Sequence, residues 1–171
     1  MEKLQILTYP HPFLKKVADP VPLDSVNDTF RKMIDEMFQL MYKSHGGGLA
    51  ATQVGLNLRF FIMDGSKEKN QRLVVINPEI LETKDEVYEE EGCLSFPGVS
   101  AKVKRARWVK MKAYNALGEH YTLETDGYLG RCIQHELDHL NGITYFDHLS
   151  PLKRKMIEKK YQKLMRENSK N

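Results

Sequence analysis

Cysteine is scarce in this chain, which contains only Cys93 and Cys132 among its 171 residues. Two cysteines do not make a disulfide scaffold, so we interpret each as a metal ligand or a small buried residue. The sequence also lacks a low-complexity tract and an apolar run long enough to span a membrane. Its first residues mix acid, base and proline and contain no signal-peptide stretch. We therefore expect a cytoplasmic protein without a membrane partner.

The composition is ordinary for a globular protein, with 41% hydrophobic and 29% charged residues. A length of 171 residues suits one domain with its own core, and we expect a single domain over residues 1–171. The formal charge of +3 is small, and we expect no DNA partner. Charge is unevenly placed, because residues 151–171 hold eight Lys or Arg against Glu158 and Glu167. The rest of the chain is therefore slightly acidic.

Three helices are expected from apolar spacing and from helix-ending residues. Residues 24–45 carry apolar side chains at helical spacing, and a glycine cluster follows them. This stripe consists of Phe30, Met33, Ile34, Met37 and Met41. A second helix is expected over 127–140, between a capping candidate at Asp126 and a stop at Gly142. A third helix is expected after Pro151.

Between the first two helices, short β-branched or aromatic segments alternate with turn residues and predict strands. These segments are 58–64, 72–80, 108–115 and 120–125. The order of one helix, several strands and two helices is typical of an α+β domain rather than of alternating βαβ units. We expect antiparallel or mixed sheets packed around a central helix, with an N-terminal helix and a C-terminal helix beside them.

The second predicted helix contains the sequence His-Glu-Leu-Asp-His at 135–139. A helix turns about 100° per residue, so His135 and His139 lie within roughly 40° of each other and can share a metal. Glu136 lies at the edge of the same face, where it can accept a proton from a metal-bound water. Two ordinary histidines on a helix are the alternative, and the complete pattern favours a metal site.

A catalytic metal usually has three protein ligands, and four residues are candidates for the third. Tyr145 stands where the metzincin peptidases have a histidine, but a neutral phenol is a weak ligand. Glu158 lies at about the spacing of the carboxylate in thermolysin-like peptidases, within a basic helix. Cys132 would crowd three ligands onto one helix. Cys93 lies in a turn-rich segment that can reach the helix from elsewhere, and a thiolate is a good ligand.

The sequence resembles the peptide deformylases at three motifs that appear in order. These motifs are GGGLAATQ at 46–53, EGCLS at 91–95 and QHELDH at 134–139. The similarity continues through the opening ILTYPHPFLKKVADPV, the VVINPEI segment and LNGITYFDHLS, so it covers essentially the whole chain. The resemblance implies removal of the formyl group from the N-terminal formylmethionine of new polypeptides, a step of N-terminal methionine processing in protein biosynthesis. The products are formate and a free α-amine.

The resemblance also implies a metal site. Cys93, His135 and His139 would bind one divalent metal, with water as the fourth ligand. Two imidazoles and a thiolate suit Fe²⁺, Zn²⁺, Ni²⁺ and Co²⁺ alike, so ligand chemistry does not select the metal. The resemblance favours Fe²⁺ in the cell, with Zn²⁺ as an occupant of purified protein. Glu136 would accept a proton from the attacking water and return it to the leaving amine.

Two hydrogen-bond donors are implied for the oxygen of the tetrahedral intermediate. These donors are the Gln53 side-chain amide and the Leu94 backbone N–H. Composition alone would leave Gln53 as a solvated polar residue. The substrate peptide would lie along Gly46, Gly47 and Gly48, whose lack of side chains permits close approach of a backbone.

Methionine specificity is expected from an apolar pocket in the hydrolase. By position, the candidates for this pocket are Tyr128, Cys132, Ile133 and His135. Two residues depart from what is common in the family, because Gly47 replaces a bulky aliphatic residue and Arg131 replaces an apolar one. We expect these two differences to alter the rim of the substrate pocket rather than the chemistry.

Two other functions are compatible with parts of the sequence. A zinc endopeptidase with the His-Glu-x-x-His pattern would use Glu158 in place of Cys93, so Cys93→Ala would leave its metal bound. A non-catalytic metal-binding module would close the water position with a fourth protein ligand, and Glu136 would be dispensable. The partner expected from the resemblance is instead an N-formylmethionyl nascent peptide.

The last predicted helix combines an apolar stripe with many bases. We expect its apolar stripe to pack against the body, through Leu152, Met156, Tyr161, Leu164 and Met165. The exposed bases would then be Lys153, Arg154, Lys159, Lys160, Lys163 and Arg166. A solvated charged face is the simple explanation. Because the expected substrate emerges from a ribosome, a second hypothesis is that this helix docks on the ribosome.

Overall fold

The computed structural model describes residues 3–170, so the first two residues and the last residue of the expected 1–171 domain lie outside the described residues. Its α-helices are α1 (Asp28–Lys43), α2 (Gly127–Leu140) and α3 (Pro151–Ser169). Its strands are β1 (Gly48–Ala50), β2 (Phe60–Met63), β3 (Leu73–Gly92), β4 (Ser100–Tyr114) and β5 (His120–Thr125). Four short 3-10 helices are η1 (Pro12–Lys15), η2 (Leu23–Ser25), η3 (Ala51–Val54) and η4 (Tyr145–His148). The predicted α+β class is confirmed.

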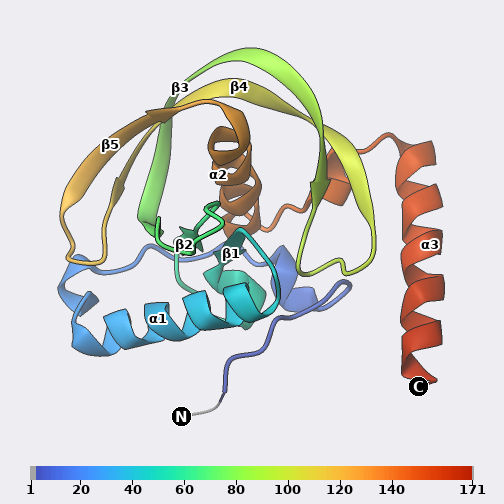
Figure 1. The fold of residues 1–171 in the computed structure, drawn as a ribbon, viewed down its shortest axis with the longest axis horizontal. Coiled ribbons are helices and arrows are strands. Elements are labelled where there is room, and N and C mark those ends of the chain that lie inside the picture. Colours follow the sequence, from blue (N-terminus) through green and yellow to red (C-terminus); the bar gives the residue numbers. More distant parts are fainter. Residues whose placement is uncertain (1–2, 171) are drawn as a thin grey trace.

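The five strands form one sheet in the order β1-β2-β3-β4-β5, and every pair is antiparallel. The antiparallel alternative of the prediction is confirmed for the described residues, which form one sheet rather than several. Strands β3 and β4 make a long curved hairpin that arches over α2, while α1 lies on the other side of the short strands (Figure 1). Because β1 stands at the end of the strand order, one of its edges faces away from the sheet.

The curvature of the arch begins at irregularities in β3. The pairing of β3 with β4 shifts between Ile76 and Glu79 and again between Ile80 and Glu82, and such shifts bend a strand. Asn77 has a φ of 50°, and its side chain holds both backbone polar groups of Val21 at 2.8 and 2.9 Å. The N-terminal segment therefore pins the sheet at its bend.

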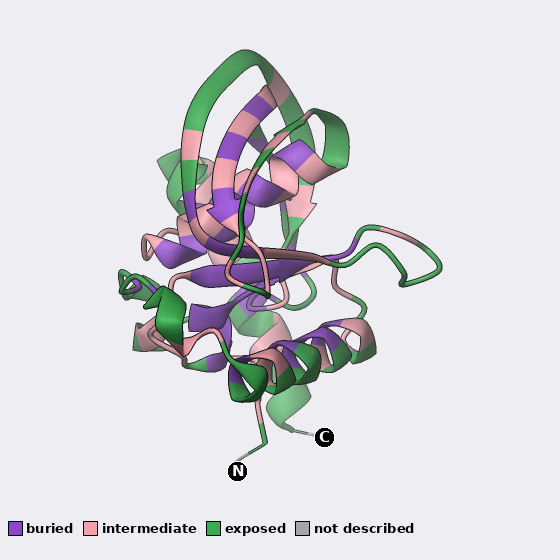
Figure 2. Ribbon diagram, turned by 90° about the vertical axis from the view of Figure 1, so that its left-hand side faces the viewer, coloured by how far each residue is buried: buried purple, intermediate pink, exposed green. Residues whose placement is uncertain are grey.

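The predicted strands 72–80 and 108–115 proved too short, because β3 and β4 run far beyond them. Beyond its bend, β3 is largely exposed, and Figure 2 shows the green outer face of the arch. An exposed strand carries polar side chains on both faces. The apolar pattern from which we predicted the strand therefore ends before the strand itself does. Strand β1 was not predicted at all, because three residues with two neighbouring glycines carry no strand pattern.

Helix α1 begins after Asn27, whose side-chain oxygen accepts the N–H of Phe30 at 3.1 Å. The predicted start at residue 24 was too early, because Leu23–Ser25 form a separate 3-10 turn. The buried face of the helix consists of Phe30, Ile34, Met37, Phe38 and Met41. This face packs against β1 and β2 in the first core cluster, and it points toward the sheet in Figure 2.

Helix α2 covers the predicted range 127–140 and is buried on two faces. On one face, Ile133 and Leu140 pack with sheet residues such as Phe61 and Met111 in the second core cluster. The helix ends at Asn141, and Gly142 follows with a φ of 72°. A left-handed φ at this position favours glycine, so the predicted stop has a clear physical cause.

Helix α3 packs on the rest of the domain through its second half, so the first two residues of the predicted apolar stripe do not pack as expected. Tyr161 is buried in the third core cluster, and Leu164 and Met165 pack against that cluster. Leu152 and Met156 are instead 73% and 65% exposed. The helix meets the body along a narrower line than its apolar spacing suggests. Of the residues 3–170, none forms a helix with the apolar length that a bilayer crossing requires.

Candidate metal centre and active site

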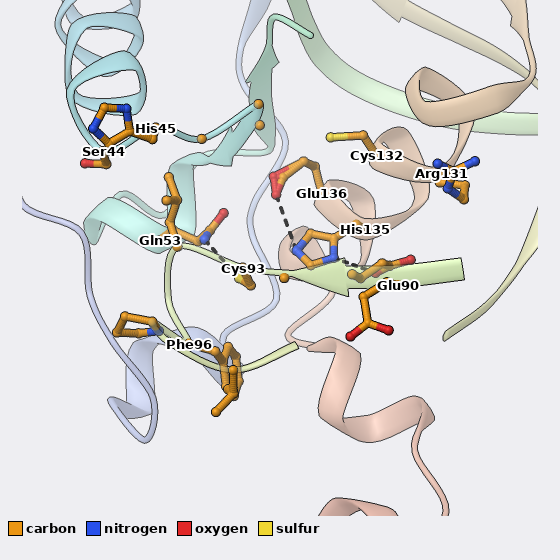
Figure 3. A pocket seen from close by; sticks show the side chains of 18 of the residues that line it. Ser44, His45, Gln53, Glu90, Cys93, Phe96, Arg131, Cys132, His135 and Glu136 are labelled. Atoms are coloured by element: carbon orange, nitrogen blue, oxygen red, sulfur yellow. Dashed lines mark hydrogen bonds and ion pairs between the residues drawn. The ribbon is translucent and has the colours of Figure 1, made fainter. Parts of the chain in front are cut away.

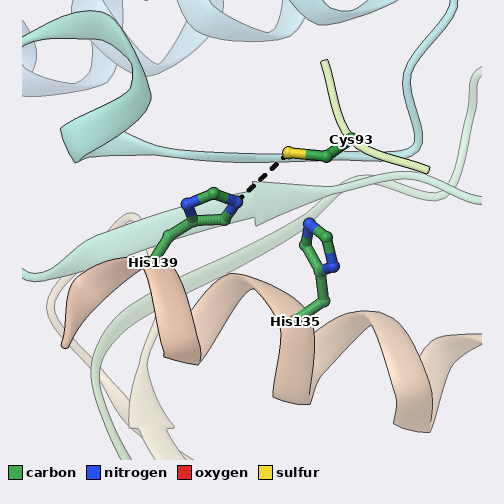
Figure 4. A group of neighbouring side chains, drawn as sticks. All are labelled: Cys93, His135 and His139. Atoms are coloured by element: carbon green, nitrogen blue, oxygen red, sulfur yellow. Dashed lines mark hydrogen bonds between the residues drawn. The ribbon is translucent and has the colours of Figure 1, made fainter. Parts of the chain in front are cut away.

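Three side chains from two parts of the chain converge beneath the arch. Cys93 directly follows β3, while His135 and His139 stand one turn apart on α2 (Figure 4). One potential ligand atom from each lies within 4.8 Å of the other two, and within residues 3–170 they form the only such group. The Cys93 sulfur and His139 Nε2 are 3.3 Å apart. A single metal ion is therefore within reach of all three.

Burial acts to lower the pKa of both histidines, but hydrogen bonds with Cys93 and Glu91 raise that of His135, so of the two only His139 has the protonation state of a metal ligand. Burial lowers the pKa of His139 well below its usual value, so its ring is neutral and offers a nitrogen lone pair. The Nδ1 atom of His135 contacts Glu91 Oε1 at 2.9 Å, which leaves Nε2 for the metal. One thiol and two imidazoles are donors that divalent transition metals prefer. The residues present thus fit one divalent ion.

A buried ionic network contacts the His135 ring at Nδ1, on the side away from the other two residues of the metal group. Arg105 donates two hydrogen bonds to Glu91, from Nε at 2.8 Å and from a terminal nitrogen at 2.9 Å, and a third to Asp138 at 2.6 Å. Asp138 also contacts His148 at 2.8 Å. Burial alone would raise the pKa of Glu91, but the hydrogen bonds from Arg105 and His135 lower it to about 2. Glu91 is therefore a permanent carboxylate that orients the His135 ring.

Glu136 lies beside the three-residue group and is 2% exposed. Its Oε1 atom is 3.9 Å from His135 Nε2, and within residues 3–170 its Oε2 atom has no hydrogen-bond partner. Burial raises the pKa of this carboxyl to about 7, although His135 acts to lower it. A metal cation bound to Cys93, His135 and His139 would lower the pKa of Glu136 from this raised value. The free oxygen is thus available to exchange a proton inside the site.

Gln53 is also buried, with only 1% of its surface exposed, so it is not the solvated residue that composition suggests. Its side-chain oxygen accepts the N–H of Ala50 at 2.9 Å. Its amide nitrogen donates to Ser95 Oγ at 3.0 Å and lies 3.6 Å from the Cys93 sulfur. The bond to Ala50 fixes which end of the amide faces Cys93. The side chain therefore presents N–H groups toward the metal group.

These residues share one cavity of about 510 Å³, shown in Figure 3. Gln53 and Glu136 lie around Cys93 and His135 in that view. The predicted site residues that line the cavity are Gly46, Gly47, Gly48, Gln53, Cys93, Leu94, Tyr128, Cys132, His135 and Glu136. Arg131 lines it as well. Chain segments that are distant in sequence thus build a single concave site.

A sequence model of the family described as polypeptide deformylase matches residues 3–155. The chain belongs to the peptide deformylase family. Members of this family are metal-dependent enzymes, and the group of Cys93, His135 and His139 could bind one metal ion.

Solved deformylase structures share the fold along nearly the whole chain. The enzyme from Legionella pneumophila is 39% identical with a TM-score of 0.94, and the match covers 99% of each chain. The enzyme from Thermotoga maritima is 42% identical with a TM-score of 0.81, covering 88% of this chain and all of that one. The enzyme from Synechococcus elongatus, solved in complex with actinonin, is 37% identical with a TM-score of 0.88, covering 92% and 86%.

The other three candidates for the third metal ligand, Glu158, Tyr145 and Cys132, do not belong to the group formed by Cys93, His135 and His139. Glu158 accepts a hydrogen bond from the Tyr9 hydroxyl at 2.7 Å. Tyr145 is buried and donates to the Val99 carbonyl at 3.4 Å, so it is a packing residue. Cys132 lines the cavity outside the three-residue group. Ile133, predicted near the methionine pocket, packs into the second core cluster because it points to the opposite face of α2.

Sequence reasoning missed the network behind His135. Glu91 stands two residues before Cys93, and this position within a motif was a signal that could have identified it. Arg105 gave no such signal, because it is one of several bases in β4, and only its burial distinguishes it. Ser95 was also missed, although it is the last residue of the EGCLS motif, because a serine is usually solvated.

We expect Glu91→Gln to lower metal affinity by about 10- to 100-fold, the usual cost of changing the partner of a metal-bound histidine. The neutral amide holds the His135 ring less firmly and leaves Arg105 without its carboxylate. Metal affinity can be measured by competition with a chelating dye. Glu90→Gln is the matched control, because Glu90 is exposed and accepts a hydrogen bond from Ser100 at 2.7 Å. Equal losses in both variants would contradict the role of Glu91.

Proposed function

We propose that this chain removes the formyl group from the N-terminal formylmethionine of nascent polypeptides in the cytoplasm and releases formate. The observation that carries the proposal is the convergence of Cys93, His135 and His139 on one point, at a cavity that Glu136 and Gln53 also line. Membership of the deformylase family supports it. We further propose that residues 1–171 act as one catalytic domain, with α2 as its catalytic helix.

Cys93, His135 and His139 would hold the metal, which we propose to be Fe²⁺ in the cell. Zn²⁺, Ni²⁺ and Co²⁺ suit the same donors. A divalent metal supplies Lewis acidity, which lowers the pKa of a coordinated water and polarises the formyl carbonyl. The Glu91 carboxylate would keep the His135 ring oriented toward it.

Glu136 would move the proton of the reaction. Its carboxylate takes a proton from the attacking water as the new C–O bond forms at the formyl carbon. The carboxyl group then returns that proton to the nitrogen as the C–N bond breaks, so formic acid and a neutral amine leave, and the acid gives its remaining proton to solvent to become formate. The position supports this role, because Glu136 Oε2 is buried and without another partner.

Two donors would stabilise the oxygen that becomes negative in the tetrahedral intermediate. The Gln53 amide already points N–H groups toward Cys93, and its orientation is set by its bond to Ala50. The Leu94 backbone N–H directly follows Cys93 in the chain. A preorganised donor of this kind is typically worth about a hundredfold or more in rate.

The substrate backbone would bind along residues 46–48. Strand β1 has an edge that faces away from the sheet, so an extended peptide can add to it by strand pairing. A Cβ at Gly46 would lie 2.5 Å from Leu94 Cδ1, and one at Gly48 would lie 2.9 Å from the Cys132 sulfur. The space over this strand is therefore too small for side chains. Tyr128 and Cys132 would contact the first side chain of the substrate.

The decisive test is formate release from formyl-Met-Ala-Ser by metal-loaded protein. The proposal requires that formate be released at a rate proportional to enzyme concentration, and that acetate not be released from acetyl-Met-Ala-Ser at a comparable rate. Cleavage of an internal peptide bond without formate would instead indicate an endopeptidase. That alternative has no support here, because Glu158 is bound to Tyr9 rather than placed near the histidines.

We also propose that α3 docks on the ribosome through its exposed bases. Lys159, Lys160 and Lys163 are all exposed, and Leu152 and Met156 leave apolar side chains uncovered on the same helix. Lys153 and Arg154 are less accessible than predicted, since they contact Tyr88 and Asp147. Exposed positive charge favours binding to a polyanionic surface such as that of the ribosome.

Reversing three of these charges should weaken ribosome binding by about tenfold or more at low salt, because each base displaces a counterion. The variant is Lys159→Glu, Lys160→Glu and Lys163→Glu, and binding is measured by co-sedimentation over a range of salt concentrations. The control reverses three exposed lysines elsewhere, namely Lys32, Lys43 and Lys67. Binding that is unaffected by salt, or weakened equally in both variants, would exclude docking through α3.

A further inference from the structure

Tyr128 separates two cavities. It is the second residue of α2, and its side chain is 53% exposed. It borders the active-site cavity and also a second cavity of about 400 Å³, and it is the one residue common to both linings. The apolar part of the second lining consists of Met63, Leu73, Leu123 and Leu129. Asp64, Gln71 and Arg72 line it as well, so a single aromatic ring stands between the active-site cavity and a second, partly apolar cavity.

Two glycines make room for this ring. Gly47 precedes β1 and Gly65 follows β2, and the Gly47 carbonyl accepts the N–H of Asp64 at 2.9 Å. A Cβ at Gly47 would overlap the Tyr128 hydroxyl. A Cβ at Gly65 would lie only 3.3 Å from two ring carbons of Tyr128. We call Gly47 and Gly65 the glycine platform, because the ring occupies space that side chains would fill at either position.

A polar contact also holds the hydroxyl end of the ring. Tyr128 interacts with the Cys132 thiol, which stands one turn further along α2 and lines the same cavity. Cys132 and burial raise the pKa of Tyr128, so its phenol stays neutral. A neutral ring can form the wall of an apolar pocket without a desolvation cost for charge.

We propose that Tyr128, resting on the glycine platform, is a specificity-determining residue that limits how long a first side chain the active site accepts. The inference rests on the proposed deformylase function. With the ring in place, the active-site cavity ends at the phenol. Without it, the cavity continues into the partly apolar cavity beyond, which would take the end of a straight alkyl chain longer than methionine.

The test compares wild type and Tyr128→Ala on two peptides, formyl-Met-Ala-Ser and formyl-2-aminodecanoyl-Ala-Ser. The ratio of kcat/KM for the long substrate over the methionine substrate should rise about tenfold or more in the variant, mainly through KM. Tyr88→Ala is the matched control, because Tyr88 is 51% exposed and borders neither cavity. An unchanged ratio in Tyr128→Ala, or an equal rise in Tyr88→Ala, would overturn the inference.

A thermal double-mutant cycle tests the platform without any activity. Gly47→Ala should lower the unfolding midpoint by roughly 2 to 4 °C, because the new methyl group displaces the Tyr128 hydroxyl. The same change made in Tyr128→Ala should lower the midpoint much less. Additive shifts would overturn the role of the platform. Wild type that releases no formate from either peptide would overturn the proposed function itself, a result distinct from an active enzyme with an unchanged ratio.

Discussion

Cys93→Ala should release the metal and abolish formate production. Two histidines on one helix would remain, and the loss of the thiolate removes the ligand that reaches them from another part of the chain. We expect metal affinity to fall by more than the roughly 10- to 100-fold that changes outside the ligand shell cost. The measurement is metal content after dialysis, together with the visible spectrum of the Co²⁺-loaded protein, which reports thiolate coordination.

Cys132→Ala is the matched control for this change. Both cysteines line the same cavity, but only Cys93 belongs to the three-residue group. Cys132→Ala should therefore keep the metal and the thiolate band of the Co²⁺ spectrum. Retention of metal by Cys93→Ala would contradict the proposed ligand set and would favour a site completed by a carboxylate, as in an endopeptidase.

Glu136→Gln should lower kcat for formate release by about 10²- to 10⁴-fold while the metal stays bound. Glutamine has nearly the shape of glutamate, but its amide cannot accept the proton of water. Because the side chain is 2% exposed, solvent has little access to replace the carboxylate. The measurement is kcat at saturating formyl-Met-Ala-Ser, with metal content determined on the same sample.

A second variant separates proton transfer from packing at this position. Glu136→Asp keeps the carboxylate but retracts it by one methylene, so we expect activity between those of wild type and Glu136→Gln. If Glu136→Gln retains nearly full activity with its metal bound, another group moves the proton, and the role proposed for Glu136 is wrong.

Elements with a complete local signal were predicted well. The predicted strand 120–125 and the predicted helix 127–140 coincide with β5 and α2. In α2 the turn-to-turn spacing and the glycine stop act within a few residues of one another, whereas the predicted cap Asp126 makes no side-chain capping hydrogen bond. The pairing of His135 with His139 on one face follows from the same local geometry, and so does the position of Glu136 beside them.

Elements that depend on distant contacts were predicted poorly. The length of β3 and β4 follows from their pairing with each other. Their exposed polar residues give no sequence pattern that predicts this pairing. In α3, Leu152 and Met156 fit the apolar spacing, but the body of the protein ends before it reaches them. An amphipathic pattern shows which face of a helix can be buried, not how much surface is available to cover it.

By itself, the sequence determined that two histidines and a glutamate share a helix face, and its three motifs resembled one enzyme family. Only the tertiary structure decided that the Cys93 sulfur lies 3.3 Å from His139, that Arg105 links Glu91 to Asp138, and that Tyr128 rests on Gly47. The physical reason is distance along the chain. Helix geometry relates residues three or four apart, whereas the first two contacts exist because a bent hairpin returns over α2, and the third exists because β1 lies against α2.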